Sequence, residues 1–158
     1  MTIHTEAKAL AALRAATLTH DLETKQLKKL ASLASLVEFA AGDIIYHEGQ
    51  PGQAVYLVRA GKVVIEIESP TQEIAVVNTV EVGEFFGWSS LFPSVDQGNK
   101  RARAIEPTWA FAFDANLLQE AWKTDHLLEN AIIKCVAKIT LDRLKESRQQ
   151  LVNAFATK

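Results

Sequence analysis

The chain has 158 residues, of which 48% are hydrophobic and 23% charged, and its formal net charge is −2. This composition predicts one globular domain over residues 1–158, and the small net charge excludes a strong overall attraction to nucleic acid or anionic lipid. No apolar run approaches the roughly 20 residues that span a bilayer, so no membrane segment is predicted.

The amino terminus and the single cysteine bear on the cellular compartment. The first residues, up to Thr17, include acidic side chains and lack an uninterrupted apolar stretch, which argues against a signal peptide. Cys135 has no partner for a disulfide within the chain, which fits a reducing compartment. Because apolar residues surround it, we interpret Cys135 as a buried helix residue rather than a reactive thiol. A cytoplasmic location is predicted.

Residues 1–36 are predicted to form two helices. Ala7, Leu10, Leu13 (or Arg14) and Leu18 give a weak apolar stripe in the first helix. Residues 19–21, Thr-His-Asp, offer capping groups ahead of the second helix. The leucines expected to face a common core in that helix are Leu22, Leu27, Leu30, Leu33 and Leu36.

Residues 37–114 consist of short β-type segments separated by turn signals, a spacing typical of a compact sandwich or barrel. Residues 55–58 and 63–68 are rich in β-branched and aromatic side chains, as strands usually are. Further strands are predicted at 74–80 and 108–113.

The strand at 63–68 shows a clear alternation. Glu66 and Glu68 alternate with isoleucines, so both glutamates are expected to face outward. The preceding turn contains Gly61, which is expected to take a positive φ.

Residues 115–158 are predicted to be helical. A short amphipathic element starts near Asn116 and ends near Thr124, and the stretch from Leu127 to Phe155 has no Gly or Pro and predicts one long helix. Its first apolar stripe comprises Leu128, Ile132, Cys135 and Ile139. A second stripe, at coiled-coil-like spacing, comprises Leu141, Leu144, Leu151 and Phe155.

The two stripes suggest different partners. The first is expected to pack on the barrel of its own chain. The second would be exposed unless another chain covers it, so we predict a homodimer through Leu141, Leu144, Leu151 and Phe155.

Residues 83–92, GEFFGWSSLF, carry the strongest functional signal. Glycine permits close backbone approach, and the first N–H groups of a helical turn have no partners within the turn. Such a segment can cradle an anion. A basic strand start follows at Lys100, Arg101 and Arg103.

Four blocks, at residues 33–45, 48–63, 83–87 and 103–108, stand in an order that resembles the cyclic-nucleotide-binding domain family. The family includes the catabolite activator protein and the regulatory subunit of cyclic-AMP-dependent protein kinase, and this chain looks like a stand-alone, bacterial-like member. The resemblance covers residues 22–151. It implies a mainly β fold, a double-stranded β-helix (jelly roll) at 37–114, flanked by helices at 1–36 and 115–158.

The family's selective side chains do not carry over. In the family, a glutamate after Phe-Gly binds the ribose and an arginine neutralises the cyclic phosphate. Trp88 stands in the glutamate position, and the register set by residues 104–108 places the arginine slot on Gly98. Moving Arg101 into that slot needs an odd shift, which turns strand side chains to the other face unless a bulge absorbs it. We therefore expect a degenerate phosphate-binding cassette that binds cyclic nucleotides about 10³-fold more weakly.

A remnant of the ligand site is still expected. Glu84 is expected to brace the turn, the Ser89 and Ser90 amides to point toward an anion, and Trp88 to lie near the barrel mouth, either plugging the pocket or stacking on a ligand. The predicted set is Gly83, Glu84, Phe86, Gly87, Trp88, Ser89, Ser90 and Arg101.

Other chemistries find little support in the sequence. In the barrel only His47, beside Glu48, resembles a metal ligand, and one such pair is too few for a catalytic metal. No catalytic grouping is apparent, so no enzyme and no cofactor are predicted. The basic segment at 100–103 is interpreted either as a solvated strand edge or as an anion site, with direct DNA binding less favoured.

These observations predict a non-catalytic sensor or regulatory module. Its ligand, if it has one, is expected to be an anion or a nucleotide. Its output is expected to be an unknown protein partner or its own dimerisation, without contact to DNA or membrane. The alternative is a ligand-independent protein-interaction scaffold on the same fold.

Overall fold

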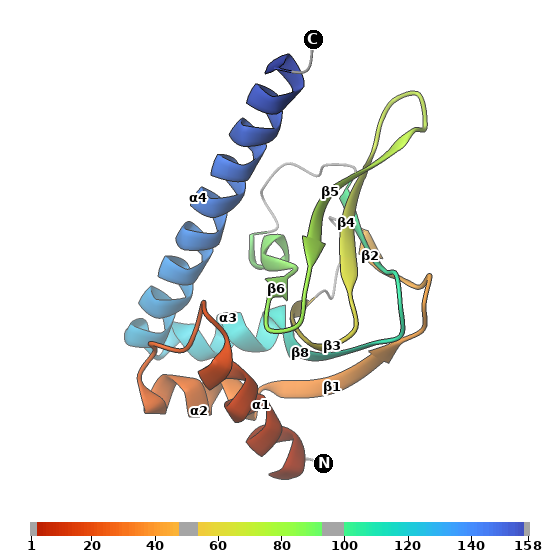
Figure 1. The fold of residues 1–158 in the computed structure, drawn as a ribbon. Helices are drawn as coiled ribbons and strands as arrows, with labels where there is room; N and C mark the ends of the chain where they lie inside the picture. The colour runs from red at the N-terminus through yellow and green to blue at the C-terminus, as the bar shows by residue number, and fades with distance from the viewer. Residues whose placement is uncertain (1–2, 48–53, 93–99, 157–158) are drawn as a thin grey trace.

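The computed structural model describes residues 3–47, 54–92 and 100–156. Two helices, α1 (Ile3–Ala15) and α2 (Thr24–Ser32), precede the strands, and α3 (Ala115–Lys123) and α4 (His126–Ala156) follow them (Figure 1). The strands are β1 (Ala34–Phe39), β2 (Ile44–His47), β3 (Ala54–Ala60), β4 (Val63–Glu68), β5 (Ile74–Val80), β6 (Phe85–Phe86), β7 (Lys100–Ala104) and β8 (Thr108–Asp114), with a short 3₁₀ helix, η1 (Trp88–Leu91), after β6.

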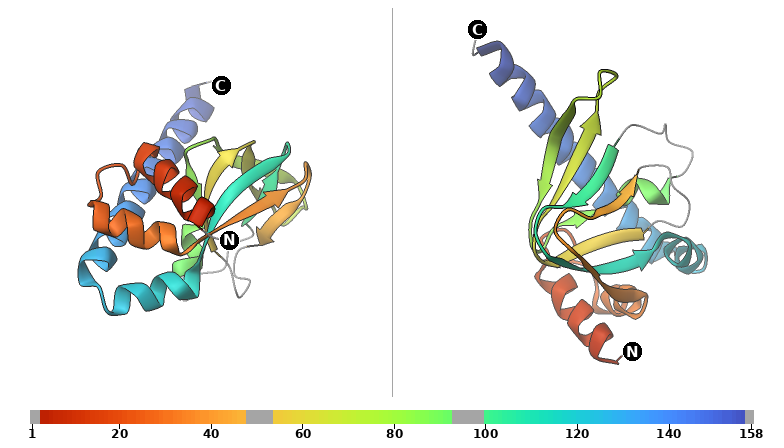
Figure 2. Two further views of the ribbon diagram at one scale, coloured as in Figure 1. Left: turned by 90° about the horizontal axis from the view of Figure 1, so that it is seen from below. Right: turned by 90° about the vertical axis from the view of Figure 1, so that its right-hand side faces the viewer.

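The strands form two four-stranded antiparallel sheets, in the orders β1-β8-β3-β6 and β2-β7-β4-β5. Figure 2 shows the sheets curling into a barrel, with α1, α2 and α3 gathered at one end. The predicted fold class, a jelly roll between flanking helices, is confirmed. No helix in the described part of the chain is long and apolar enough to cross a membrane.

Local boundaries at the amino terminus differ from the sequence prediction. Helix α2 starts after Glu23, whose backbone N–H donates to Gln26 in a capping box, and not after residues 19–21. Thr19 is instead buried, and its hydroxyl donates to the Leu13 carbonyl at 2.6 Å. Strand β1 already begins at Ala34, so Leu36 lies in a strand rather than in the second helix.

The barrel wall separates two apolar clusters. The helix-side core includes Leu57, Phe111 and Phe113 from the strands together with Leu13, Leu30 and Ile132 from the helices. The barrel core lies between the sheets and comprises Tyr46, Val58, Val63, Ile65, Val80, Phe86 and Ala102. Neighbouring residues of one strand therefore reach different cores, as the period of two requires.

Helix α4 also divides into two parts. Its inner half buries Leu128, Ile132 and Cys135, whereas every residue from 144 to 156 is exposed. Burial raises the pKa of the Cys135 thiol to about 11, and its Sγ lies 3.4 Å from the Leu18 carbonyl. The interpretation of Cys135 as a buried helix residue is confirmed. The outer half projects past the barrel (Figure 1).

Candidate ligand site

The segment from β6 to η1 forms the compact turn that the sequence predicted. Gly87 precedes η1 with φ of 91°, and a Cβ at this position would lie 2.6 Å from the Ala54 carbonyl oxygen. Only glycine satisfies both the backbone angle and the close approach. Before it, Phe86 enters the barrel core and stacks on Tyr56, with ring centroids 4.8 Å apart, while Phe85 joins the helix-side core.

Glu84 braces the preceding turn, as expected. The Glu81 backbone N–H donates to Glu84 Oε1 at 2.8 Å, and the Glu84 N–H donates back to the Glu81 carbonyl at 3.0 Å. Gly83 takes a φ of 86° within the same turn, which suits a residue without a Cβ. Gly83 and Glu84 also line a cavity between α4 and the strands.

The η1 turn uses donors that were expected to face an anion. The Ser90 N–H donates to the Gly87 carbonyl at 3.1 Å, and the Ser90 hydroxyl donates to the same oxygen at 2.7 Å. The Ser90 amide is therefore occupied within its own turn, which corrects the expectation that it points toward a ligand. Ser89 contributes its carbonyl oxygen as acceptor for the Phe92 N–H.

Trp88 belongs to the helix-side core. Its indole packs against Phe85, with ring centroids 5.4 Å apart, and against the apolar cluster beneath the helices. The indole Nε1 is buried and has no hydrogen-bond partner within the described residues. The expected position of Trp88 at the barrel mouth is therefore corrected, because the αL turn at Gly87 directs this side chain to the other side of the sheet.

Arg101 and Arg103 converge on Glu66. Arg101 Nε donates to Glu66 Oε1 at 3.0 Å; Arg103 donates through Nε to Oε1 at 3.1 Å and through a terminal nitrogen to Oε2 at 2.8 Å. In the register of β4 and β7, Glu66 pairs with Arg101 and Ile65 with Ala102. Since Ile65 and Ala102 face the barrel core, this ion cluster lies on the opposite, outer face of the sheet.

This cluster overturns two sequence interpretations and refines a third. Glu66 lies on the outer face, as predicted, but it is only 3% exposed, and the arginine hydrogen bonds, that of Arg103 first, hold the pKa of its carboxyl below the usual range. Strand β7 lies between β2 and β4, so the basic segment is not a sheet edge. Arg101 belongs to the Glu66 cluster rather than to the cassette.

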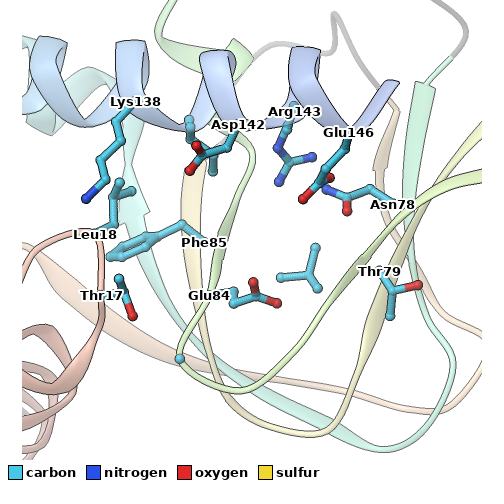
Figure 3. A pocket seen from close by; sticks show the side chains of 13 residues that line it. Thr17, Leu18, Asn78, Thr79, Glu84, Phe85, Lys138, Asp142, Arg143 and Glu146 are labelled. Atoms are coloured by element: carbon cyan, nitrogen blue, oxygen red, sulfur yellow. The ribbon is translucent and has the colours of Figure 1, made fainter. Parts of the chain in front are cut away.

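A cavity of about 260 Å³ opens between α4 and the segment from β5 to β6 (Figure 3). We call it the α4 pocket. Its charged and polar lining residues are Thr17, Asn78, Thr79, Glu84, Lys138, Asp142, Arg143 and Glu146. Its apolar lining includes Leu18, Val80, Phe85 and Ile139.

Arg143 is the distinctive cation of the α4 pocket. It extends from α4 toward the strands, with Glu146 from the next turn of the same helix and Asn78 on the facing strand (Figure 3). Partial burial lowers the pKa of Arg143, and the negative charges of Glu146 and Glu84 and the Tyr46 phenol oppose this shift. The Arg143 guanidinium is therefore partly buried, with the carboxylates of Glu84 and Glu146 in the same pocket.

The sequence analysis did not predict the α4 pocket, because it considered only the apolar stripes of the long helix. A signal was present, since Lys138, Asp142 and Glu146 recur every four residues and therefore share one helix face. The structure brings Gly83 and Glu84 to this pocket but places Phe86 and Trp88 in different cores.

Some sequence expectations fall elsewhere. Glu48 and the arginine slot at Gly98 lie outside the described residues. His47 ends β2, and no group of three or more metal-ligand side chains occurs among the residues that were described.

Comparison with known proteins gives a family match. Residues 36–125 match the model of the cyclic nucleotide-binding domain family. A search of curated proteins found no match.

Solved structures agree with this assignment. A putative cyclic nucleotide-binding protein from Geobacter metallireducens is 26% identical with a TM-score of 0.73, and the match covers 86% of this chain and 98% of that one. The catabolite activator protein of Thermus thermophilus is 25% identical with a TM-score of 0.66, over 87% of this chain and 62% of that one.

A third structure shares the fold. It is the regulatory subunit of a cAMP-independent protein kinase A from Trypanosoma cruzi, bound to guanosine, which is 18% identical with a TM-score of 0.74. The match covers 98% of this chain and 52% of that one.

Proposed function

This chain belongs to the cyclic nucleotide-binding domain family, and we propose on that basis that it is a non-catalytic sensor or regulatory module with a degenerate phosphate-binding cassette. The proposal rests on one observation: the cassette keeps the backbone turn of the family but lacks the side chains that would contact the ribose and the cyclic phosphate. The backbone turn at Gly87 is intact, but Trp88 packs into the helix-side core and Arg101 is engaged by Glu66. Cyclic AMP and cyclic GMP would therefore find neither the ribose glutamate nor the phosphate arginine.

Titration calorimetry with cyclic AMP and cyclic GMP tests this proposal. We expect no binding in the micromolar range, because a missing charge-assisted contact costs about tenfold or more in affinity and two are missing. Micromolar or tighter binding of either cyclic nucleotide would contradict the degenerate cassette.

We further propose that the module forms a homodimer through the outer half of α4. Leu141, Leu144 and Leu151 are 65%, 45% and 60% exposed, and Phe155, which continues their stripe, is 64% exposed. These side chains lie on one face at coiled-coil spacing, and a stripe of this kind is normally covered by another helix.

Light scattering from 1 to 100 micromolar protein (about the range in which weak dimers dissociate) tests the dimer. We expect Leu144→Asp to produce a monomer, because it places a charge in the apolar seam. Gln150→Asp is the matched control, since it adds the same charge to another face of the same helical segment. A monomeric wild-type protein at every concentration would refute the dimer.

The proposed output is a protein contact rather than DNA. In support, the two arginines of the basic segment both donate to Glu66, which offsets one of their two positive charges and leaves fewer of their N–H groups for phosphate contacts. We propose a cytoplasmic location on the basis of the single, buried cysteine.

A ligand-independent interaction scaffold is the alternative. Two observations favour it: the Ser90 amide is occupied within its own turn, and Trp88 fills the helix-side core. A dimer that binds none of the cyclic nucleotides or nucleosides would support the scaffold.

A further inference from the structure

We infer that the α4 pocket binds an uncharged nucleoside rather than a nucleotide. The inference rests on the proposed function, since it names the ligand class of the sensor. It is carried by the balance of charge around the cavity and by the position of Arg143.

The charge of the pocket opposes a phosphate. Three carboxylates, from Glu84, Asp142 and Glu146, face two cations, from Lys138 and Arg143, so the lining carries a net charge of −1 at neutral pH. A phosphodiester would add another negative charge to a partly desolvated space, where repulsion is weakly screened. A cationic ligand would meet Lys138 and Arg143. A neutral ligand avoids both penalties.

The other arginines near the cassette do not offset the negative charge of the α4 pocket. Arg101 and Arg103 are held by Glu66 on the outer face of the sheet, whereas the α4 pocket lies on the side of α4 and β5. The Ser90 N–H is used within the η1 turn. Among the described residues, a phosphate in the α4 pocket would therefore depend on Lys138 and Arg143, whose charges are outnumbered by the neighbouring carboxylates.

The same groups suit a neutral ring that has both donors and acceptors. Arg143 can donate to a carbonyl or ring nitrogen, and the carboxylates of Glu84 and Glu146 can accept from ring N–H or ribose hydroxyl groups. Phe85 and Ile139 supply an apolar wall for the face of a base. The volume of about 260 Å³ lies just below the range of about 300–1,000 Å³ that is usual for small-molecule sites, which favours a single small ligand.

Matched ligand pairs test the inference by calorimetry at fixed ionic strength. Adenosine is compared with cyclic AMP, and guanosine with cyclic GMP, because each pair shares base and sugar and differs in the charged phosphodiester. We expect at least one nucleoside to bind about tenfold or more tightly than its cyclic monophosphate.

Variants assign the binding to the α4 pocket. Arg143→Gln should weaken nucleoside binding about tenfold or more, since it removes the central charged donor. Glu84→Gln combined with Glu146→Gln should shift the preference toward the cyclic nucleotide, and the amide oxygen introduced by Glu84→Gln would still accept the bond that braces the turn. The control is Lys145→Gln, which removes a positive charge from an exposed position of the same helix and should leave binding unchanged.

The outcomes separate the inference from the proposed function. A cyclic nucleotide that binds as tightly as its nucleoside, or no nucleoside binding up to about millimolar concentration, would overturn the inference. If the protein is nevertheless a dimer that Leu144→Asp dissociates, the proposed dimerisation through the outer half of α4 still holds. Nucleoside binding that Arg143→Gln does not affect would also overturn the assignment to this pocket.

Discussion

The Glu66 cluster and the α4 pocket both contain arginine, but the arginines have different surroundings in the two places. On the outer face of the β2-β7-β4-β5 sheet, two arginines close on one carboxylate, and both oxygens of Glu66 accept direct hydrogen bonds of 2.8–3.1 Å. Beneath α4, Arg143 lies beside an open cavity with more carboxylates than cations around it. The closed cluster is suited to holding strands together, and the open one is suited to meeting a ligand.

The largest expected effect is on stability when the closed cluster loses its carboxylate. Glu66→Leu should lower the free energy of unfolding by about 2–4 kcal/mol, because it leaves two arginines side by side on β7 with no counter-charge. Urea denaturation at pH 7 measures this change. Glu38→Leu, at an exposed position of β1, is the control and should change stability by less than about 0.5 kcal/mol. Equal losses of stability at the two positions would show that the Glu66 cluster does not stabilise the sheet.

The two arginines should differ in their contributions. Arg103 makes two hydrogen bonds to Glu66 and Arg101 makes one, and both side chains retain some exposure, at 31% and 23%. Arg103→Gln should therefore cost about 1–2 kcal/mol and Arg101→Gln about half as much, after allowance for solvent screening. Denaturation curves of the two variants at the same pH give the ranking. A larger effect at Arg101 would contradict the geometry.

The contribution of Glu66 should depend on pH. Since the arginines lower the pKa of Glu66 below its unfolded value of 4.5, its stabilising effect is fully present above about pH 4.5. The effect is then lost as pH falls through the lower, folded pKa. The stability difference between wild type and Glu66→Gln should shrink between pH 6 and pH 3 (roughly spanning that window). A stability difference between wild type and Glu66→Gln that grows as the pH falls would contradict a lowered pKa for Glu66.

The smallest expected effect on stability is at Arg143. Burial lowers the pKa of this arginine, which means that its surroundings disfavour the charge despite the neighbouring Glu84 and Glu146. Arg143→Met keeps the length of the side chain and should change the free energy of unfolding by less than about 0.5 kcal/mol, or raise it slightly. Thermal or urea unfolding measures the effect. A loss of stability as large as that of Glu66→Leu would show that Arg143 stabilises the fold, as Arg103 does.

The sequence by itself determined the elements and their order. Alternation at 63–68 predicted β4, and a further strand was predicted at 74–80, where β5 forms. The absence of Gly and Pro after Leu127 predicted α4, and the glycines at 61 and 87 predicted turns that the structure shows at φ of 96° and 91°. These features depend on interactions between residues close in the chain. Local periodicity and backbone angles therefore report them directly.

Only the tertiary structure decided where the charged and aromatic side chains go. The alternation of β4 correctly placed Glu66 opposite Ile65, but only the pairing of β4 with β7 brings two arginines over it and buries it. Likewise, Trp88 packs in the helix-side core after the positive φ at Gly87, and Arg143 and Glu84 line one pocket because α4 passes alongside the segment from β5 to β6. Such contacts join residues tens of positions apart, and the free energy that selects them comes from long-range packing and desolvation, which a local pattern does not record.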